Sequence, residues 1–420
     1  MDIKEFKGTL FNEKPLELIC DDHSEKVRCV FSINKNEIIV SSELEKPSDI
    51  GRNRETVDLH YYSDLVEAKI TVSMSKHNFL SFEANVREMI IESKHHHSIN
   101  NISYIIAGAD SWFDRNNFEW SRNYEINKEI YHVNYSFIQN QILTRIDPDL
   151  NSKSDEFIEI SRHIEDEVFV MCQSYSFCRG TKVEWVVKTF LNDINDVRYH
   201  YISSNAPSKF YNLINPMRSD NDLWQRFIQH VVDKQISKKE LVDNQVFQAI
   251  NNIIWNGSLN EWTLIAHASA LEGLCKKTEI SVIETKEYKK IRKFLLKNLS
   301  DNLHSFNMTE DCFNTIKQNI CDNERTLNGF PTKWYINEAL NFHGLEKYSS
   351  DNLSKISKAI GMRNKIVHEG WSDKWDLDMY DYIKILRDTI CLLVFSFYDY
   401  SGGFYLLNED NTVTLSDYRK

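Results

Sequence analysis

Residues 361–370 read GMRNKIVHEG, and they close a segment whose apolar residues recur at helical spacing. Upstream of them, Leu353, Ile356 and Ile360 follow one another at steps of three and four, the spacing that places side chains on one face of a helix. Gly370 suits the end of that helix, because glycine readily adopts the left-handed conformation that often follows the last turn. The stretch therefore predicts an amphipathic helix that ends just before Gly370.

Polar side chains enter the apolar pattern in the last turns of this helix. Arg363 follows Ile360 by three residues, so the apolar stripe directs an arginine inward. Asn364 and His368 are four residues apart and therefore stacked neighbours beside it. A guanidinium can fork onto a phosphate oxygen and stabilise the charge of a transition state, and an imidazole can move a ribose 2′-hydroxyl proton. These side chains predict a phosphate-cleaving set that needs no metal ion.

A purely structural interpretation of the same residues stays open. Cationic side chains near the C-terminus of a helix are favourable anyway, because they complement the helix dipole. The same spacing of arginine and histidine also occurs at Arg54 and His60, in a segment with a strand pattern. The spacing alone therefore does not decide between catalysis and helix stabilisation.

The stretch RNKIVHEG, residues 363–370, resembles the signature of the HEPN superfamily. In that signature a polar residue directly follows an arginine, and a histidine stands four to six residues beyond the arginine. The resemblance implies a helical bundle that dimerises so that two motifs face one cleft, and a metal-independent ribonuclease without a cofactor. It implies Arg363 and His368 as the catalytic pair and Asn364 as their polar companion. The implied partners are RNA, with tRNA one candidate, and a second copy of the chain or a higher homo-oligomer.

One acidic residue is an orienting candidate for the motif arginine. Residues 262–275 predict a helix, and Glu272 lies beside its apolar stripe. In HEPN relatives an acidic residue of an early helix often approaches the motif arginine, so the resemblance makes Glu272 a further site residue. A solvated glutamate, or one that forms a lone salt bridge, is the alternative.

Residues 286–299, KEYKKIRKFLLKNL, predict a helix with an apolar and a basic face. In an acidic chain this basic face is a candidate RNA-binding surface, and a plain solvated face is the alternative. The lysines concerned are Lys286, Lys289, Lys290, Lys293 and Lys297.

Composition narrows the class of protein. The chain has 420 residues and a formal net charge of −12, which argues against broad, non-specific binding to nucleic acid backbones. Its eight cysteines include no CxxC pair, so we expect reduced thiols and no zinc site. We find no secretion signal, no apolar run long enough to span a membrane and no P-loop. We expect a cytoplasmic protein without a membrane partner.

The N-terminal part, residues 1–204, reads as a succession of strands. Short segments rich in β-branched and aromatic residues alternate with turns, which predicts an antiparallel β-sandwich-like or barrel-like domain. The clearest segments are 26–33, 36–45, 66–74, 77–86, 102–109, 167–177, 182–190 and 197–203.

Two clusters in this part invite a functional interpretation. Residues 94–97 read KHHH, but neighbouring histidines on a strand point to opposite faces, which favours a solvated strand end over a metal site. Residues 111–120 read SWFDRNNFEW, and aromatic side chains around one arginine suit a ligand pocket, although core aromatics are the commoner explanation.

The rest of the chain predicts helices. Residues 205–222 contain two prolines among polar residues and are a linker candidate, and 223–400 show helical periodicity. The strongest pattern covers 376–398, whose apolar last third must be buried in the bundle or in a subunit interface. Residues 401–420 form a tail with a small hairpin. The expected fold class is α+β.

This layout, a β-rich N-terminal domain followed by a HEPN helical bundle, resembles the ApeA-like proteins of bacterial anti-phage defence. The resemblance implies a ribonuclease held dormant until infection (abortive infection), with the N-terminal domain as the sensor of a phage-derived trigger or as a brake. Two rivals remain. One is a HEPN module that binds RNA or a nucleotide without cutting it, and the other is a β-sandwich ligand receptor that its helical half dimerises.

Overall fold

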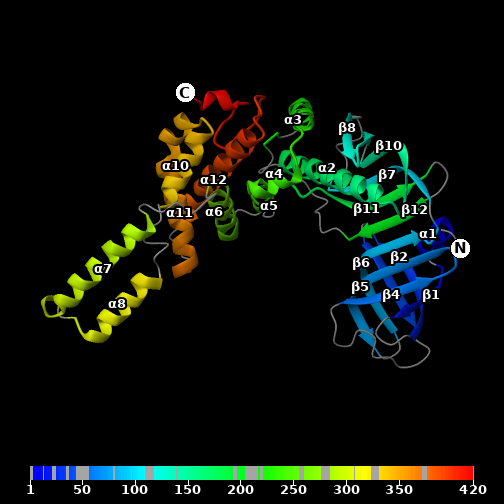
Figure 1. Cartoon of the computed structure of the whole chain (residues 1–420), viewed down its shortest axis with the longest axis horizontal. Helices are drawn as coiled ribbons and strands as arrows, with labels where there is room; N and C mark the ends of the chain where they lie inside the picture. Colours follow the sequence, from blue (N-terminus) through cyan, green and yellow to red (C-terminus); the bar gives the residue numbers. More distant parts are fainter. Residues whose placement is uncertain are drawn as a thin grey trace. The chain divides into compact units, whose positions relative to one another are not determined.

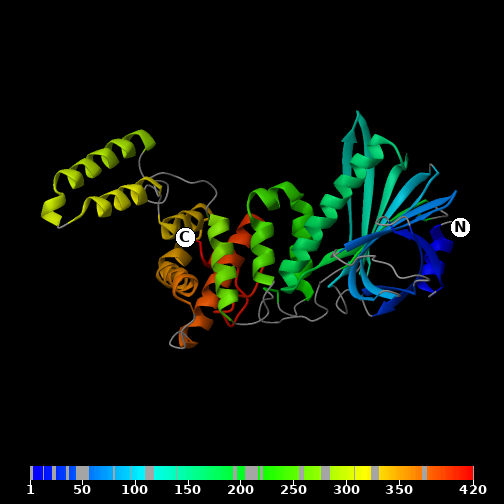
Figure 2. The ribbon, with the colours of Figure 1, turned by 90° about the horizontal axis from the view of Figure 1, so that it is seen from below.

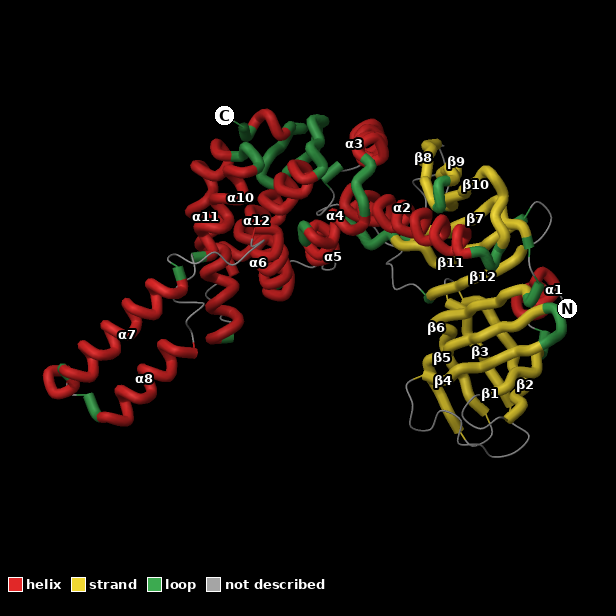
Figure 3. The backbone as a smooth tube through the Cα atoms, in the orientation of Figure 1, coloured by secondary structure: helices red, strands yellow, loops and turns green. Residues whose placement is uncertain are grey.

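The chain forms two compact units in the computed structural model, shown in Figure 1. Unit 1 comprises Met1–Asn215 and Ile228–Lys238, and unit 2 comprises Pro216–Phe227 and Lys239–Lys420. Unit 1 holds the strands and unit 2 holds most of the helices (Figure 3). The structure describes residues 3–12, 14–20, 25–34, 37–43, 56–78, 81–95, 97–108, 118–138, 140–192, 196–203, 216–217, 221–254, 260–275, 284–306, 308–322, 331–370 and 376–419.

Six antiparallel strands of unit 1 close into a barrel. They pair in the order β3-β2-β1-β4-β5-β6, and β3 also pairs with β6, which joins the two ends. Leu16, Leu18 and Cys20 of β1 are buried whereas Glu17 is exposed, because successive side chains of a strand point to opposite faces. The strands are β1 (Leu16–Cys20), β2 (Glu25–Asn34), β3 (Glu37–Glu43), β4 (Thr56–Tyr62), β5 (Val66–Asn78) and β6 (Ser81–Ser93).

Apolar side chains fill the barrel. Leu18, Val40 and Ile70 are fully buried in one cluster, and Phe6 from helix α1 (Ile3–Phe11) belongs to the same cluster. Burying a side chain of this size stabilises the fold by about 1.5–3 kcal/mol. As in other small barrels, the interior is a core made of side chains.

The sheet continues beyond the barrel from β6. Its order there is β6-β12-β11-β7-β10-β9-β8, and all these pairs are antiparallel. Helix α2 (Asp155–Arg179) lies along one face of this open part and contacts β8, β10 and β11 (Figure 2). The strands are β7 (Ser98–Ala107), β8 (Phe118–Ile126), β9 (Glu129–Ile138), β10 (Gln141–Asn151), β11 (Glu184–Leu191) and β12 (Asp196–Ile202).

The α+β class is confirmed, and of the two arrangements that the strand pattern left open, a sandwich or a barrel, the barrel is the one observed. The twelve strands found in the described residues belong to one sheet, which closes on itself at the pairing of β3 with β6. Alternating side chains indicate a sheet with one buried face, and they do so equally for a sandwich and for a barrel. Only the long-range pairing distinguishes the two.

The strand expected at residues 167–177 is wrong, because this segment is the second half of α2. Nearly every side chain there is buried, so the apolar residues show no helical periodicity. Ser174 satisfies its hydroxyl within the helix by donating to the Val170 carbonyl at 2.9 Å. The signals that marked the helix are its ends, where Ser154 caps the first turn and Gly180, with φ of +65°, ends the last.

Helices build unit 2. The helices α6, α11 and α12 contact one another, α5 and α10 pack against α6, and α7 contacts α8. The expected linker, 205–222, falls largely outside the described residues. These helices are α4 (Lys238–Asp243), α5 (Val246–Ile254), α6 (Glu261–Cys275), α7 (Thr285–Asp301), α8 (Glu310–Asp322), α10 (Thr332–Phe342), α11 (Glu346–Glu369) and α12 (Asp376–Phe397), with short 3-10 turns at Leu303–Phe306 and Leu415–Asp417. Helix α3 (Asn221–Lys234) begins in unit 2, and its residues from Ile228 onward belong to unit 1.

The apolar last third of α12 is buried inside unit 2. Phe395 packs against Phe227 of α3 and is stacked on Phe404 of the tail, with ring centroids 5.5 and 4.2 Å apart. Val394 and Cys391 are fully buried as well. The sequence left open whether this segment is buried in the bundle or in a subunit interface. Within a single chain it is buried in the bundle.

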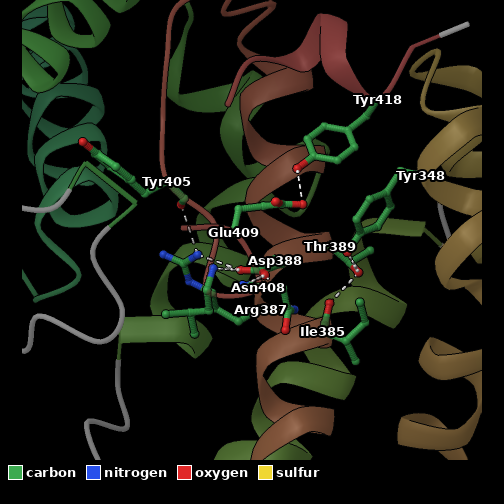
Figure 4. Close-up of polar contacts among 10 residues, drawn as sticks. Tyr348, Ile385, Arg387, Asp388, Thr389, Tyr405, Asn408, Glu409 and Tyr418 are labelled. Atoms are coloured by element: carbon green, nitrogen blue, oxygen red, sulfur yellow. Dashed lines mark hydrogen bonds and ion pairs between the residues drawn. The ribbon is translucent and has the colours of Figure 1, made fainter. Parts of the chain in front are cut away.

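The C-terminal tail folds back onto the middle of α12 (Figure 4). An antiparallel bridge joins Phe404 to Val413, as the expected hairpin requires. The carboxylate of Asp388 accepts hydrogen bonds from the backbone N–H groups of Leu407 at 2.8 Å and Asn408 at 2.9 Å, and from Arg387 at 2.8 Å. Asp388 and Arg387 are 1% exposed. A charged pair so deeply buried persists only because the tail satisfies its hydrogen bonds.

Candidate active site

The polar residues of the motif lie near the C-terminal end of α11. Ile356 and Ile360 of the preceding turns are buried, as the predicted stripe requires. The helix ends at Glu369, and the following Gly370 has a φ of +81° and donates its N–H to the Ile366 carbonyl at 3.1 Å. The predicted helix end is therefore confirmed.

Arg363 joins α11 to α6. Its Nη2 donates to a carboxylate oxygen of Glu272 in an ion pair, and its Nη1 donates to Oδ1 of Asn364 at 2.9 Å. The Arg363 and Glu272 side chains are only 19% and 28% exposed, so solvent and salt screen the pair less than they screen a surface pair. Nε of Arg363 is buried and has no hydrogen-bond acceptor among the described residues. The guanidinium is thus oriented by two contacts, and its Nε–H is among the donors that remain unused.

Asn364 and His368 face solvent. Both side chains are exposed, and His368 makes no hydrogen bond or ion pair with any residue that the structure describes. Because His368 stands five positions after Arg363, it points about 140° around the helix from the arginine. Within one chain, therefore, the structure brings Arg363, Asn364 and Glu272 together and leaves His368 apart from the arginine.

The five lysines proposed for RNA binding are all exposed on α7. Lys290 pairs with Glu287 of the same helix, with Nζ and Oε1 2.6 Å apart. Such exposed pairs within a helix contribute only about 0.3–0.5 kcal/mol and leave the cation available to a partner. The structure thus confirms that a basic face exists, and the role of that face stays a prediction.

The two clusters of the β-rich part show no metal or ligand geometry in the described residues. His97 is hydrogen-bonded through Nε2 to the Ser93 hydroxyl at 2.8 Å, and His95 is exposed. His96 and residues 111–117 lie outside the described residues. No group of three potential metal ligands occurs in the described part of the chain. Trp120, the end of the aromatic cluster, is stacked on Tyr135 in the core, with ring centroids 4.8 Å apart.

His267 lies on α6 together with Glu272 and was not among the predicted site residues. His267 is fully buried, and burial is the largest cause that lowers its pKa from 6.5 to about 4. The backbone of Ile383 opposes this shift, and the charge of Arg387 adds to it. Its position three residues after Leu264, on the apolar stripe, was the signal of a core histidine.

No family model, no curated protein and no solved structure matches the chain. The class of protein is therefore defined by the fold alone, as an α+β protein with a closed antiparallel barrel in one unit and a helical second unit. None of the helices in the described residues is long and apolar enough to cross a membrane.

Proposed function

We propose that unit 2 is a HEPN-type endoribonuclease that cleaves RNA without a metal ion. The observation that carries this proposal is the ion pair between Arg363 and Glu272. An acidic residue of an early helix against the motif arginine is what the HEPN resemblance implies. The two residues lie on different helices and are 91 positions apart in the chain, so their contact does not follow from the motif that suggested the family.

The proposed reaction is an attack of the ribose 2′-oxygen on the neighbouring phosphorus. The bond from phosphorus to the 5′-oxygen breaks, which leaves a 2′,3′-cyclic phosphate and a free 5′-hydroxyl. His368 in its neutral form takes the proton of the 2′-hydroxyl, or as an imidazolium it gives a proton to the leaving oxygen. Such proton transfer contributes a rate factor of about 10²–10⁴.

Arg363 stabilises the charge that grows on the non-bridging phosphate oxygens. Glu272 holds Nη2 and so fixes the plane of the guanidinium, while Asn364 occupies Nη1 at 2.9 Å. A phosphate oxygen can replace the Asn364 amide at Nη1 and leave the contact with Glu272 intact. Glu272 is therefore a positioning residue, and Asn364 is a polar companion that phosphate displaces.

A homodimer, or a higher homo-oligomer, completes the site in this proposal. Arg363 and His368 diverge within one helix, so two copies of α11 across a twofold axis supply both groups to one cleft.

The test compares wild type with His368→Ala and with His95→Ala. His95 is an exposed histidine of unit 1 and serves as the matched control. Each protein is incubated with total RNA in EDTA, after circular dichroism has shown that all three are folded. Cleavage by wild type and His95→Ala alone, with 2′,3′-cyclic phosphate ends, is the expected result. Cleavage by all three would remove His368 from the mechanism.

Absence of cleavage by all three proteins would favour the rival without catalysis. RNA binding that survives His368→Ala would then identify a non-catalytic HEPN module. A latent enzyme is distinguished by assaying RNA from phage-infected cells that express the same three proteins, because infection supplies the trigger.

The proposed setting is anti-phage defence, in which the chain cuts RNA once a phage-derived trigger is sensed by unit 1. This part rests on the ApeA-like order of a β-rich unit before a helical unit. The barrel does not support the alternative of a ligand receptor, because apolar side chains fill the interior of the barrel. Plaque assays on cells that express wild type, His368→Ala or His95→Ala test the setting. Protection by wild type and His95→Ala but not by His368→Ala is expected.

A further inference from the structure

Helix α7 carries an apolar band that no described residue covers. Ile291, Phe294 and Leu295 are 47%, 66% and 57% exposed, and their spacing of three and four places them on one face. Tyr288 and Leu296 are partly exposed and continue the apolar surface beyond Leu295, since Tyr288 lies only about 20° from Leu295 on the helix projection. The band is therefore the most exposed part of one wide apolar face of α7, a helix that also contacts α8.

A row of cations runs directly beside this band. Lys286, Lys290, Lys293 and Lys297 are exposed, and at about 100° per residue they fall within about 60° of one another on the helix. Phe294 lies about 40° from Lys290 on the same projection. With six basic and two acidic residues α7 has a net charge of +4, in a chain whose net charge is −12.

The charges argue against α7 of a second copy as the cover. Pairing two α7 bands would bring both cationic rows to the same interface, and like charges at that distance repel. RNA would pair with the charges of the lysines, because phosphates bind cationic side chains. It would leave Ile291 and Leu295 in water, since aliphatic side chains neither stack on bases nor bind phosphates. A partner that binds both the lysines and the apolar band must therefore carry negative charge at its surface and an apolar layer beneath it.

We propose that α7 binds the surface of an anionic lipid bilayer. The helix lies in the plane of the interface, with its apolar band among the acyl chains and its lysines on the lipid phosphates, which is how amphipathic helices of this composition bind. No membrane-spanning segment is needed. We expected no membrane partner because the sequence shows no apolar run long enough to span a membrane, but a helix that lies in the membrane interface needs no such run. The proposal is independent of the ribonuclease chemistry.

The test is flotation of the full-length protein with lipid vesicles. Vesicles of phosphatidylcholine alone are compared with vesicles that also contain phosphatidylglycerol. Wild type is expected to float only with the anionic vesicles, and added salt is expected to weaken that binding, since salt screens the attraction between the lysines and the lipid phosphates. Wild type that floats with neither kind of vesicle would overturn the proposal.

Two variants separate the apolar and the electrostatic contributions. Ile291→Gln with Phe294→Gln and Leu295→Gln is expected to bind anionic vesicles at least about tenfold more weakly. Replacing the four lysines by glutamine is expected to weaken binding about a hundredfold or more. The control variant, Trp262→Gln with Phe342→Gln, removes two exposed aromatic residues from α6 and α10 and is expected to bind like wild type. All altered side chains are exposed, so the variants are expected to fold.

The other occupants give different patterns in the same experiment. If the apolar variant still floated like wild type while the lysine variant lost RNA binding, α7 would be an RNA surface and the proposal would fail. If wild type ignored vesicles and had a larger mass in solution than the apolar variant, a second copy would cover the band. Either pattern contradicts the bilayer.

Discussion

Arg363 of α11 and Glu272 of α6 form an ion pair that is mostly sheltered from solvent and that fixes one edge of the guanidinium. The pair joins two helices of unit 2 at the motif. A cation that is already oriented needs less ordering when an anion binds, and such preorganisation is the main way in which proteins stabilise developing charge.

The first prediction concerns this pair. Glu272→Gln is expected to lower the cleavage rate about tenfold and Arg363→Ala about a hundred- to a thousandfold, because only the arginine meets the phosphate. Combining both changes is expected to cost no more than Arg363→Ala alone, since Glu272 acts through Arg363. Single-turnover rates of the four proteins measure this.

Glu338→Gln is the matched control for that series, because Glu338 is exposed on α10. If the factors by which the two single changes lower the cleavage rate multiply in the double variant, Glu272 has a role of its own. A double-mutant cycle on the free energy of unfolding is expected to give a coupling of about 1 kcal/mol for the pair.

The second prediction is that His368→Ala leaves stability unchanged. His368 is exposed and has no hydrogen-bond partner among the described residues, so the free energy of unfolding is expected to change by less than about 0.5 kcal/mol. Urea denaturation followed by circular dichroism provides the value. A loss of about 2 kcal/mol or more would support the rival in which these residues only stabilise a dimerising bundle.

The third prediction follows from His267. Its pKa in the folded protein is about 4 against 6.5 for the ordinary side chain, so the unfolded chain binds more protons between these values. The free energy of unfolding is therefore expected to fall as the pH drops through this window, by up to about 3 kcal/mol from this residue. Above about pH 6.5 both states are neutral there, and the contribution is constant.

Comparison with His267→Asn isolates this contribution. The variant is expected to be less stable at neutral pH but to lose less stability on acidification than wild type. Parallel curves for the two proteins from neutral to acidic pH would show that the imidazole does not titrate as its burial indicates.

The fourth prediction concerns the buried carboxylate of α12. Asp388→Ala is expected to lower the free energy of unfolding by about 3–5 kcal/mol, because Arg387 stays buried without its partner and the N–H groups of Leu407 and Asn408 lose their acceptor. Asp381→Ala, on the same helix but exposed, is expected to cost less than about 0.5 kcal/mol. Thermal unfolding distinguishes them, and limited proteolysis is expected to cleave the tail of Asp388→Ala only.

The fifth prediction uses the eight free cysteines as probes of burial. Cys312 and Cys321 on α8 are exposed and the other six are buried. Burial also raises the pKa of several thiols, for example that of Cys29 to about 12, so they are neither accessible nor ionised. Two thiols are expected to react with an aromatic disulfide reagent in the native protein and all eight after denaturation. Fast reaction of Cys29 would mean that the barrel opens.

Local sequence patterns predicted some features of the fold, whereas other features depend on contacts between distant residues. The end of α11 was predicted because Gly370 and the stripe through Ile360 are local signals. The helical periodicity gave no sign of the break between α4 and α5, which falls at Gln245, whose φ of +60° no sequence rule for glutamine predicts. Barrel closure depends on the pairing of β3 with β6, which joins residues about forty positions apart in the chain.

The candidate site shows the same division. Arg363, Asn364 and His368 share one helix, so helical spacing alone placed them relative to one another. Glu272 was selected through the HEPN resemblance, and only the packing of α6 on α11 brings it to the arginine. The buried pair in α12 was overlooked, although two charges in the middle of an apolar helix, at Arg387 and Asp388, were a readable signal.

The anchoring of the tail on Asp388 constrains insertions and deletions. The carboxylate accepts hydrogen bonds from the N–H groups of two successive residues, Leu407 and Asn408. The contact therefore depends on the length of chain between the end of α12 and these two residues. Removing or adding one residue in 399–405 would present different N–H groups and shift the buried Phe404. Variation in length is tolerated instead where the tail is exposed, at Asp410 and Asn411, beyond the anchored residues.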